Sequence, residues 1–349
     1  MTADAPIAAE DQALATAMAG DIAGAIAIYR RLTAERPNEP DLHYALGHLL
    51  LLTGDFSAGW TEHERRSHRA MPFPAWRGEP LGGATILVHG EQGFGDNFQF
   101  ARYATLVAER GGRVIVGTRL QISRLLSTIR GVERTIVSGD SLEGIARHAP
   151  MLSLPAIFGT DLSSIPASVP YISPVPSLVE HWRRRLDGFS GLRVGIVWSG
   201  NTEAPYNYRR SPGLAPFLAL MDCPGVTFFG MQLGGGHREL QGMVPPSNFV
   251  DIAPELVSFD HTAGAMANLD LVISSCTAPA HLAGALARPL WVVLPSLPDW
   301  RWFLARDDSP WYPTARLFRQ DAPGDWTPVF ARMREALAQL AAARRDAPI

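Results

Sequence analysis

Lysine is absent from this sequence, so all 31 residues of the Lys and Arg class are arginine. A side chain that binds an anion through positive charge must therefore be Arg or His. The net charge is −3, so no broad positive field indicates nucleic acid as a partner.

Cysteine is scarce, and long apolar runs are missing. The two cysteines, Cys223 and Cys276, cannot build a disulfide framework, and no Cys/His cluster has the spacing of a zinc site. The acidic first residues, MTADAPIAAEDQ, lack the basic and apolar segments of a signal peptide. Apolar runs such as Leu49–Leu52 are much shorter than a membrane span. We therefore expect a soluble, cytoplasmic protein with no membrane partner.

The sequence does contain enough apolar material for two or three domains, with 46% hydrophobic residues in a chain of 349. Its first region is helical and repeated: GDIAGAIAIYRRL, which begins at Gly20, aligns with GDFSAGWTEHERR, which begins 34 positions later at Gly54. Ala25 falls opposite Gly59, and small residues there let two helices approach closely. This period is typical of tetratricopeptide repeats. About two repeats fit before residue 70, fewer than a solenoid usually needs, so we expect the segment to pack on the following domain.

After a linker rich in Pro and Trp, Met71–Leu81, short apolar runs alternate with amphipathic segments. This alternation predicts a parallel α/β sheet. The expected strands are Thr85–His89, Arg113–Val116, Thr135–Val137, Arg193–Trp198, Val226–Met231, Leu269–Ser274 and Leu290–Leu294. The expected helices are Asn97–Glu109, Leu120–Ile129, His261–Asn268, Ala278–Ala287 and Thr327–Ala343.

A Pro-rich segment, Ile165–Pro176, separates two such α/β halves. We therefore expect three domains: helical repeats at 1–70, a first α/β domain at 71–176, and a second α/β domain with a closing helix at 177–349. Two α/β halves form a cleft between the carboxyl ends of their strands, where open sheets bind ligands.

The loop Glu91–Asp96 (EQGFGD) joins a strand to a helix and predicts a place where backbone approaches an anion. It is not a dinucleotide fingerprint, because the third glycine is missing and no acidic residue ends the second strand. Asp96 has two interpretations that spacing leaves open. It caps the helix, or it is a general base that faces the cleft.

The loop Ser274–His281 (SSCTAPAH) is the second strand-to-helix connection of this kind. Thr277 is a plausible N-cap, Pro279 fits a first helical turn, and N–H groups there could hold a diphosphate. His281 is either a ligand contact or a structural hydrogen-bonding residue. Cys276 is more typical of a buried small residue than of a nucleophile.

An aromatic stretch, Trp300–Trp302 followed by Trp311-Tyr312, either forms a wall of the cleft or packs the hinge under the last helix. Arg301 could contact a phosphate if the first interpretation holds. Arg209-Arg210 likewise either supplies phosphate contacts or is a solvated turn.

Four segments in this order resemble bacterial tetratricopeptide-repeat proteins with a heptosyltransferase-like (glycosyltransferase family 9-like) domain. They are EQGFGDNFQFARY, IVWSGN, LDLVISSCTAPAHLAGALARPLWVVL and DWRWF…SPWYP…LFRQ. The overall plan is similar to that of eukaryotic protein O-GlcNAc transferase, and some bacterial proteins of this plan modify flagellin. The resemblance implies a GT-B fold, in which two Rossmann-like domains face a cleft after a short helical repeat segment.

The resemblance also implies roles for single residues. Asp96 stands where the family has its proposed catalytic base. Thr277 and His281 match the family's late Asp-Thr-x-x-x-His turn, but Cys276 occupies the position of its Asp, which puts donor choice or activity in doubt. The expected donor-binding residues are Gly93, Gly95, Ser199, Asn201, Arg209, Arg210, Gln232, Cys276, Thr277, Ala278, His281 and Arg301.

The function expected from these observations is inverting transfer of a sugar from a nucleotide sugar to an acceptor hydroxyl, with a protein as acceptor or partner. No cofactor and no metal are expected, since no Asp-x-Asp pair stands in a cleft loop. Two rivals remain. One is a degenerate transferase that serves as a binding module, motivated by Cys276. The other is a sugar-nucleotide epimerase, which leaves the repeat segment without a role.

Overall fold

A computed structural model of the protein describes residues 8–205 and 207–346. Residues 1–7, the first part of the segment MTADAPIAAEDQ, lie outside the described part. The chain forms two compact units. Among the described residues, the helical unit comprises those up to 72, 155–165 and 296–306, and the α/β unit comprises 73–154, those within 166–295 and those from 307 on. The three-domain division expected at residues 70 and 176 stays a prediction, because the α/β unit contains both sheets.

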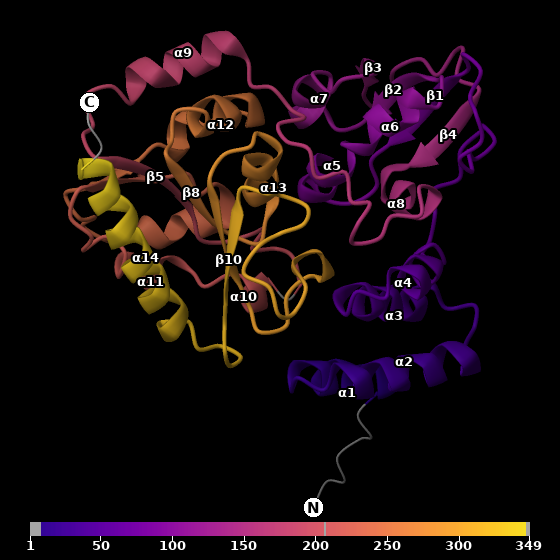
Figure 1. Ribbon diagram of the computed structural model, residues 1–349, viewed down its shortest axis with the longest axis horizontal. Coiled ribbons are helices and arrows are strands. Elements are labelled where there is room, and N and C mark those ends of the chain that lie inside the picture. The colour runs from indigo at the N-terminus through magenta and orange to yellow at the C-terminus, as the bar shows by residue number, and fades with distance from the viewer. Residues whose placement is uncertain (1–7, 206, 347–349) are drawn as a thin grey trace, which may run out of the picture. The chain divides into compact units, whose positions relative to one another are not determined.

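The helical unit begins with four helices, each packed against the next in sequence: α1 (Ala9–Met18), α2 (Ile22–Glu35), α3 (Pro40–Leu52) and α4 (Phe56–His63) (Figure 1). The two Gly-Asp pairs have the same structure. Gly20 and Gly54 have φ of +91° and +87°, a conformation that favours glycine at a helix end. Asp21 and Asp55 then cap α2 and α4 by accepting the N–H three residues on.

The small residue Gly59 brings α3 and α4 together as expected. A methyl group added at Gly59 would lie 2.7 Å from Leu51 Cγ and 3.0 Å from Leu51 N. Gly47 on α3 is equally close to the backbone of His63 on α4. The Gly-Asp turn thus has the same geometry in both copies, and the close helix contact is observed at Gly59 and Gly47.

Two segments distant in sequence complete the helical unit. Trp60 on α4 donates its indole N–H to Thr160 O at 2.7 Å. Its ring packs edge-on against Trp300 of the short 3-10 helix η4 (Trp300–Trp302), with centroids 5.3 Å apart. Phe56 packs against Phe303 with the rings tilted by 57° and their centroids 6.0 Å apart. The aromatic stretch of the sequence is thus divided, since Trp300 and Trp302 belong to the helical unit and Trp311 and Tyr312 to the α/β unit.

The first sheet of the α/β unit is parallel, with strand order β3-β2-β1-β4. Its strands are β1 (Thr85–His89), β2 (Arg113–Gly117), β3 (Val132–Ile136) and β4 (Arg147–Pro150). The connecting helices include α5 (Phe94–Phe100), α6 (Tyr103–Glu109) and α7 (Leu120–Leu126). The single helix expected at 97–109 is wrong, because the chain tightens at Ala101, whose carbonyl accepts from Ala104 N three residues later.

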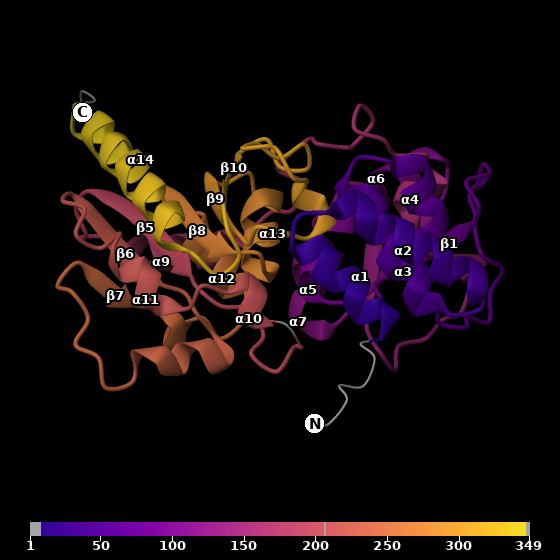
Figure 2. The same ribbon diagram turned by 90° about the horizontal axis from the view of Figure 1, so that it is seen from below.

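The second sheet is also parallel, with order β10-β9-β8-β5-β6-β7 (Figure 2). Its strands are β5 (Leu192–Val197), β6 (Val226–Gly230), β7 (Phe249–Asp251), β8 (Leu271–Ser275), β9 (Leu290–Leu294) and β10 (Ala315–Arg319). One face packs on α11 (Leu214–Leu218) and the closing helix α14 (Thr327–Asp346), where the rings of Phe217 and Phe330 lie 4.9 Å apart. The expectation of an α/β fold with parallel sheets is confirmed.

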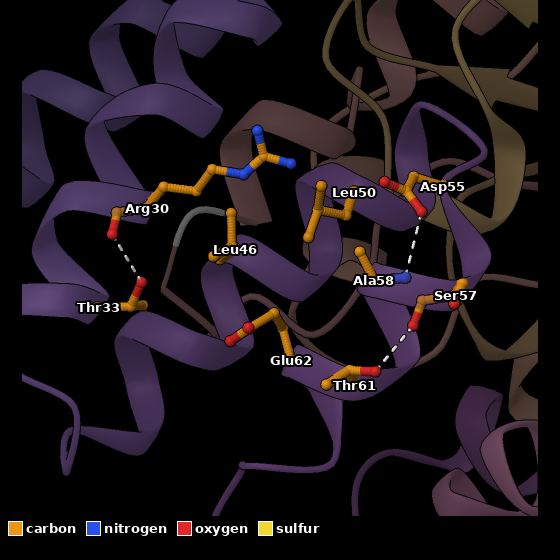
Figure 3. A pocket seen from close by; sticks show the side chains of 9 residues that line it. All are labelled: Arg30, Thr33, Leu46, Leu50, Asp55, Ser57, Ala58, Thr61 and Glu62. Carbon is orange, nitrogen blue, oxygen red and sulfur yellow. Dashed lines mark hydrogen bonds between the residues drawn. The ribbon is translucent and has the colours of Figure 1, made fainter.

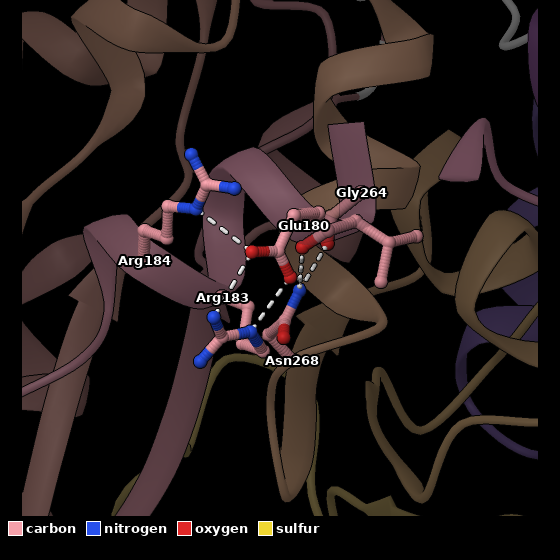
Figure 4. Close-up of polar contacts among 6 residues, drawn as sticks. Glu180, Arg183, Arg184, Gly264 and Asn268 are labelled. Atoms are coloured by element: carbon pink, nitrogen blue, oxygen red, sulfur yellow. Dashed lines mark hydrogen bonds and ion pairs between the residues drawn. The ribbon is translucent and has the colours of Figure 1, made fainter. Parts of the chain in front are cut away.

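Helix α9 (Pro176–Arg185) packs on α12 (Phe259–Met266) (Figure 4). Asn268, just after α12, donates from one amide nitrogen to Val179 O and Gly264 O, both at 2.9 Å. Glu180 accepts from Arg183 and Arg184 on the exposed side, which holds the pKa of its carboxyl at about 2. No helix in the described part of the chain is long and apolar enough to cross a membrane.

Candidate functional site

The strand orders indicate where a sheet of this kind binds ligands. In each sheet the order reverses next to the first strand: between β1 and β4, and between β5 and β8. Open parallel sheets bind ligands at such points, outside the carboxyl ends of the strands. The loops after β1, β5 and β8 leave at these points, and they are the loops that the sequence singled out.

The loop after β1 is held closed by its own side chains. Asp96 Oδ2 accepts from Gly93 N at 2.9 Å, so the capping interpretation of Asp96 describes its geometry. Asn97 donates to Gly93 O at 2.7 Å, and its side chain fills the space beside Gly90. Arg119 donates to Gln92 O and lies over the ring of Phe94. Asp96 itself is partly exposed, which leaves its catalytic role a prediction.

The two predicted loops lie against each other. A methyl group on Gly95 would be 2.8 Å from Cδ2 of His281 and 3.6 Å from Cα of Ala278. Gly95 is in the first turn of α5, and Ala278 begins α13 (Ala278–Ala285). The first turns of these two helices are therefore in direct contact, and a side chain at position 95 would require the His281 ring to move.

The loop after β8 offers a phosphate fewer donors than expected. Thr277 takes the N-cap position of α13, as predicted, but the cap has no side-chain hydrogen bond. Pro279 carries no N–H, and Ala280 N donates to Thr277 O at 3.0 Å. Cys276 is buried, with 7% of its surface exposed. A phosphate placed at this loop would therefore need arginine for much of its positive charge.

Arg102 is a buried arginine near the contact of the two loops, and the sequence patterns did not indicate it. Arg102 donates to Gln99 O, Pro166 O and Trp311 O, at 2.8, 3.2 and 2.6 Å. It also donates to Tyr171 Oη at 3.0 Å and lies over the rings of Tyr171 and Tyr312.

Tyr312 connects this arginine to the loop after β8. Its hydroxyl is 3.0 Å from Nδ1 of His281, and its ring covers Gly284 of α13. His281 is 6% exposed, and the Tyr312 hydroxyl orients its ring. The sequence contains one sign of this cluster. Gln99 and Arg102 follow Gly95 at helical spacing, so these polar residues continue the helix face on which Gly95 lies.

The loop after β5 is built around Ser199. Gln232 Oε1 accepts from the backbone N–H groups of both Trp198 and Ser199, and Gln232 Nε2 donates to Leu233 O. Gln232 is thus engaged in holding the turn. The Arg210 guanidinium lies beside Gly200, whose added methyl group would be 3.0 Å from Nη2. This places a cation directly at the loop, whereas Arg209 packs on the ring of Tyr208.

Arg301 and Asn201 differ from the other candidates. Arg301 belongs to the helical unit, where it pairs with Asp299 at 2.8 Å and lies over Trp300. Burial alone would raise the pKa of Asp299, but Arg301 and His48 hold it at about 2. Asn201 is exposed, and its Oδ1 accepts from Glu203 N. Donor binding by Arg301 or Asn201 stays a prediction. Within the described residues, no three His, Cys, Asp or Glu side chains gather as metal ligands would.

Comparison with known proteins supports a fold assignment. No family model matches the sequence. Protein FlbA of Caulobacter vibrioides is 27% identical over 345 residues, an alignment that covers 88% of this chain and 57% of FlbA. The chain therefore spans little more than half the length of this relative.

Among solved structures, ADP-heptose LPS heptosyltransferase II of E. coli matches with a TM-score of 0.54 and 15% identity, over 75% of this chain and 99% of that protein. The glycosyltransferase family 9 protein of Veillonella parvula matches with a TM-score of 0.49 and 8% identity, over 78% and 92%. The match to the E. coli protein shows that this chain shares the fold of a heptosyltransferase, in agreement with the resemblance in the sequence.

Proposed function

We propose that this chain is a GT-B glycosyltransferase, with two Rossmann-like halves in its α/β unit and a tetratricopeptide-like helical segment. It transfers a sugar from a nucleotide sugar to an acceptor hydroxyl, with inversion, without a metal and in the cytoplasm. The heptosyltransferase fold makes ADP-heptose the first donor to test. The observation that carries the proposal is the contact of Gly95 with His281, because it joins the switch-point loops of both sheets in one place.

The diphosphate binds between the loops after β5 and β8, near Arg210 and the amino end of α13. Asp96 takes the proton of the acceptor hydroxyl, and the Gly93 N–H that it accepts orients its carboxylate. Helix dipoles and arginine stabilise the leaving diphosphate.

A protein acceptor, such as flagellin, or a protein partner belongs to the same proposal. A pocket of about 330 Å³ opens on the helical unit. Figure 3 shows Arg30 and Asp55 on opposite sides of Leu46 and Leu50, with Ser57, Thr61 and Glu62 along α4. An apolar floor with charges of both signs at its rim suits an extended peptide.

The base assignment is tested by Asp96→Asn in a donor-hydrolysis and transfer assay with ADP-heptose, UDP-sugars and GDP-sugars. The amide keeps an oxygen for Gly93 N–H but cannot take a proton. We expect turnover to fall by at least about 100-fold while nucleotide affinity is kept. Asp140→Asn is the matched control, since Asp140 accepts from Val137 N at 2.8 Å in another loop of the same sheet. Full activity of Asp96→Asn would remove Asp96 from the mechanism.

A second candidate is a catalytically degenerate binding module, which Cys276 and the few N–H donors at α13 favour. Calorimetry of the wild-type chain against nucleoside diphosphates and nucleotide sugars separates the two functions. Binding of a nucleotide without turnover of any sugar donor, or no binding at all, supports the module.

A further inference from the structure

A histidine–aspartate pair lies at the carboxyl ends of β6 and β7. His237 Nε2 is 2.8 Å from Asp251 Oδ2, and both side chains are about one-third exposed, at 36% and 30%. Asp251 ends β7, and its other oxygen accepts from Ala253 N at 3.1 Å. The carboxylate is therefore fixed by backbone, and it fixes the imidazole, whose Nδ1 is directed away from the pair.

The turn that carries His237 is built against the loop after β5. A methyl group on Gly236 would lie 2.8 Å from Cβ of Ser199, and one on Gly235 would overlap the side chain of Thr202. Trp198 also donates its indole N–H to Gly236 O at 3.0 Å. The three consecutive glycines, Gly234–Gly236, thus bring the β6 loop onto the switch-point loop where the proposed diphosphate binds.

We propose that His237, oriented by Asp251, binds a ribose hydroxyl of the nucleotide. This inference rests on the proposed function and deepens it. In sheets of this strand order, an acidic residue after the second strand usually holds the ribose, with the phosphates at the loop after the first strand. Here the first strand is β5 and the second is β6. The residues after β6 are Met231 and Gln232, and Gln232 is occupied with the β5 turn. The carboxylate comes instead from β7, through His237.

Charge decides which part of the nucleotide this pair binds. A carboxylate beside the imidazole disfavours phosphate, which the arginines after β5 attract. An imidazole nitrogen accepts a hydrogen bond from a hydroxyl. Leu233, 48% exposed at the start of the same turn, adds apolar surface for the sugar or base.

The test is calorimetry with ADP, UDP and GDP, then with the 2′,3′-dideoxy analogue of the tightest binder and with pyrophosphate. We expect His237→Ala to weaken the ribonucleotide about tenfold, as loss of one hydrogen bond does, and to leave pyrophosphate binding unchanged. The dideoxy analogue should bind wild type and His237→Ala equally. Asp251→Asn, which keeps the ring but loses the charge, should fall between them.

Gln241→Ala is the matched control, an exposed residue one turn further along that should bind as the wild type does. Melting temperatures verify that each variant is folded. If His237→Ala binds the ribonucleotide normally, or loses pyrophosphate to the same degree, the His237 assignment is wrong while the transferase proposal stands. If the wild type binds neither nucleotide nor pyrophosphate, both are wrong.

Discussion

At the scale of single residues, the contact between the loops after β1 and β8 depends on a glycine rather than on a charged group. Gly95 allows α5 to touch α13, and its place in the EQGFGD loop made it visible in the sequence. Arg102 was not selected, because nothing local reveals that its partners lie 64 and 209 positions away, at Pro166 and Trp311. Sequence patterns thus locate the loops, whereas the buried charge behind them is set by long-range contacts.

The Gly95 contact predicts a specific non-additivity. Gly95→Ala places a methyl group 2.8 Å from His281 Cδ2, so we expect a loss of about 1–3 kcal/mol in the free energy of unfolding. His281→Ala removes the ring, and in that background Gly95→Ala should cost much less. A double-mutant cycle in urea measures the coupling. Additive single effects would show that the two loops are not in contact.

At the scale of elements, the strands that the sequence missed share a position. β4, β7 and β10 all lie at sheet edges. Interior strands such as Thr85–His89 and Leu290–Leu294 are buried throughout and read as apolar runs, so their limits were predicted correctly. An edge strand pairs with a strand on one side only and is less enclosed, so it does not need a continuous apolar run. RHAP and FVD, with four and three residues, are therefore too short to be distinguished from loops.

The repeated turn gives a paired prediction for the helical unit. Asp21→Ala and Asp55→Ala each remove the acceptor that caps a helix, so each should lower the free energy of unfolding by about 1 kcal/mol. Similar costs are expected because the two turns are equivalent. Glu35→Ala is the control, since its exposed ion pair with Arg31 contributes little. Urea unfolding followed by circular dichroism measures all three, and a large difference between the aspartates would contradict structural equivalence.

At the scale of the whole molecule, neither compact unit is continuous in sequence. Residues 296–306 leave the α/β unit between β9 and β10 and fold with the helices. There they bring Asp299, Arg301 and Trp300 to a cluster of rings that includes His48 and His63. The sequence predicted one place for the whole aromatic stretch, because residue order does not show that this loop divides between two units.

This cluster predicts an acid-sensitive helical unit. Burial lowers the pKa of His48 from 6.5 to about 3, and burial also lowers the pKa of His63. Between these values the unfolded chain binds the proton and the folded chain does not, so stability falls as pH falls. The contribution of His48 is complete above pH 6.5 and is lost progressively toward pH 3.

We therefore expect the melting temperature to decline from pH 7 to pH 4.5, and to decline less steeply in His48→Gln, which has no group to protonate. The window stops at pH 4.5 because Asp299, with its pKa held at about 2 against an ordinary 3.8, adds its own loss at lower pH. His181→Gln, on the exposed side of α9, is the control and should keep the wild-type slope. Equal slopes in wild type and His48→Gln would mean that His48 is already solvated in the folded protein, and that residues 296–306 do not cover α3.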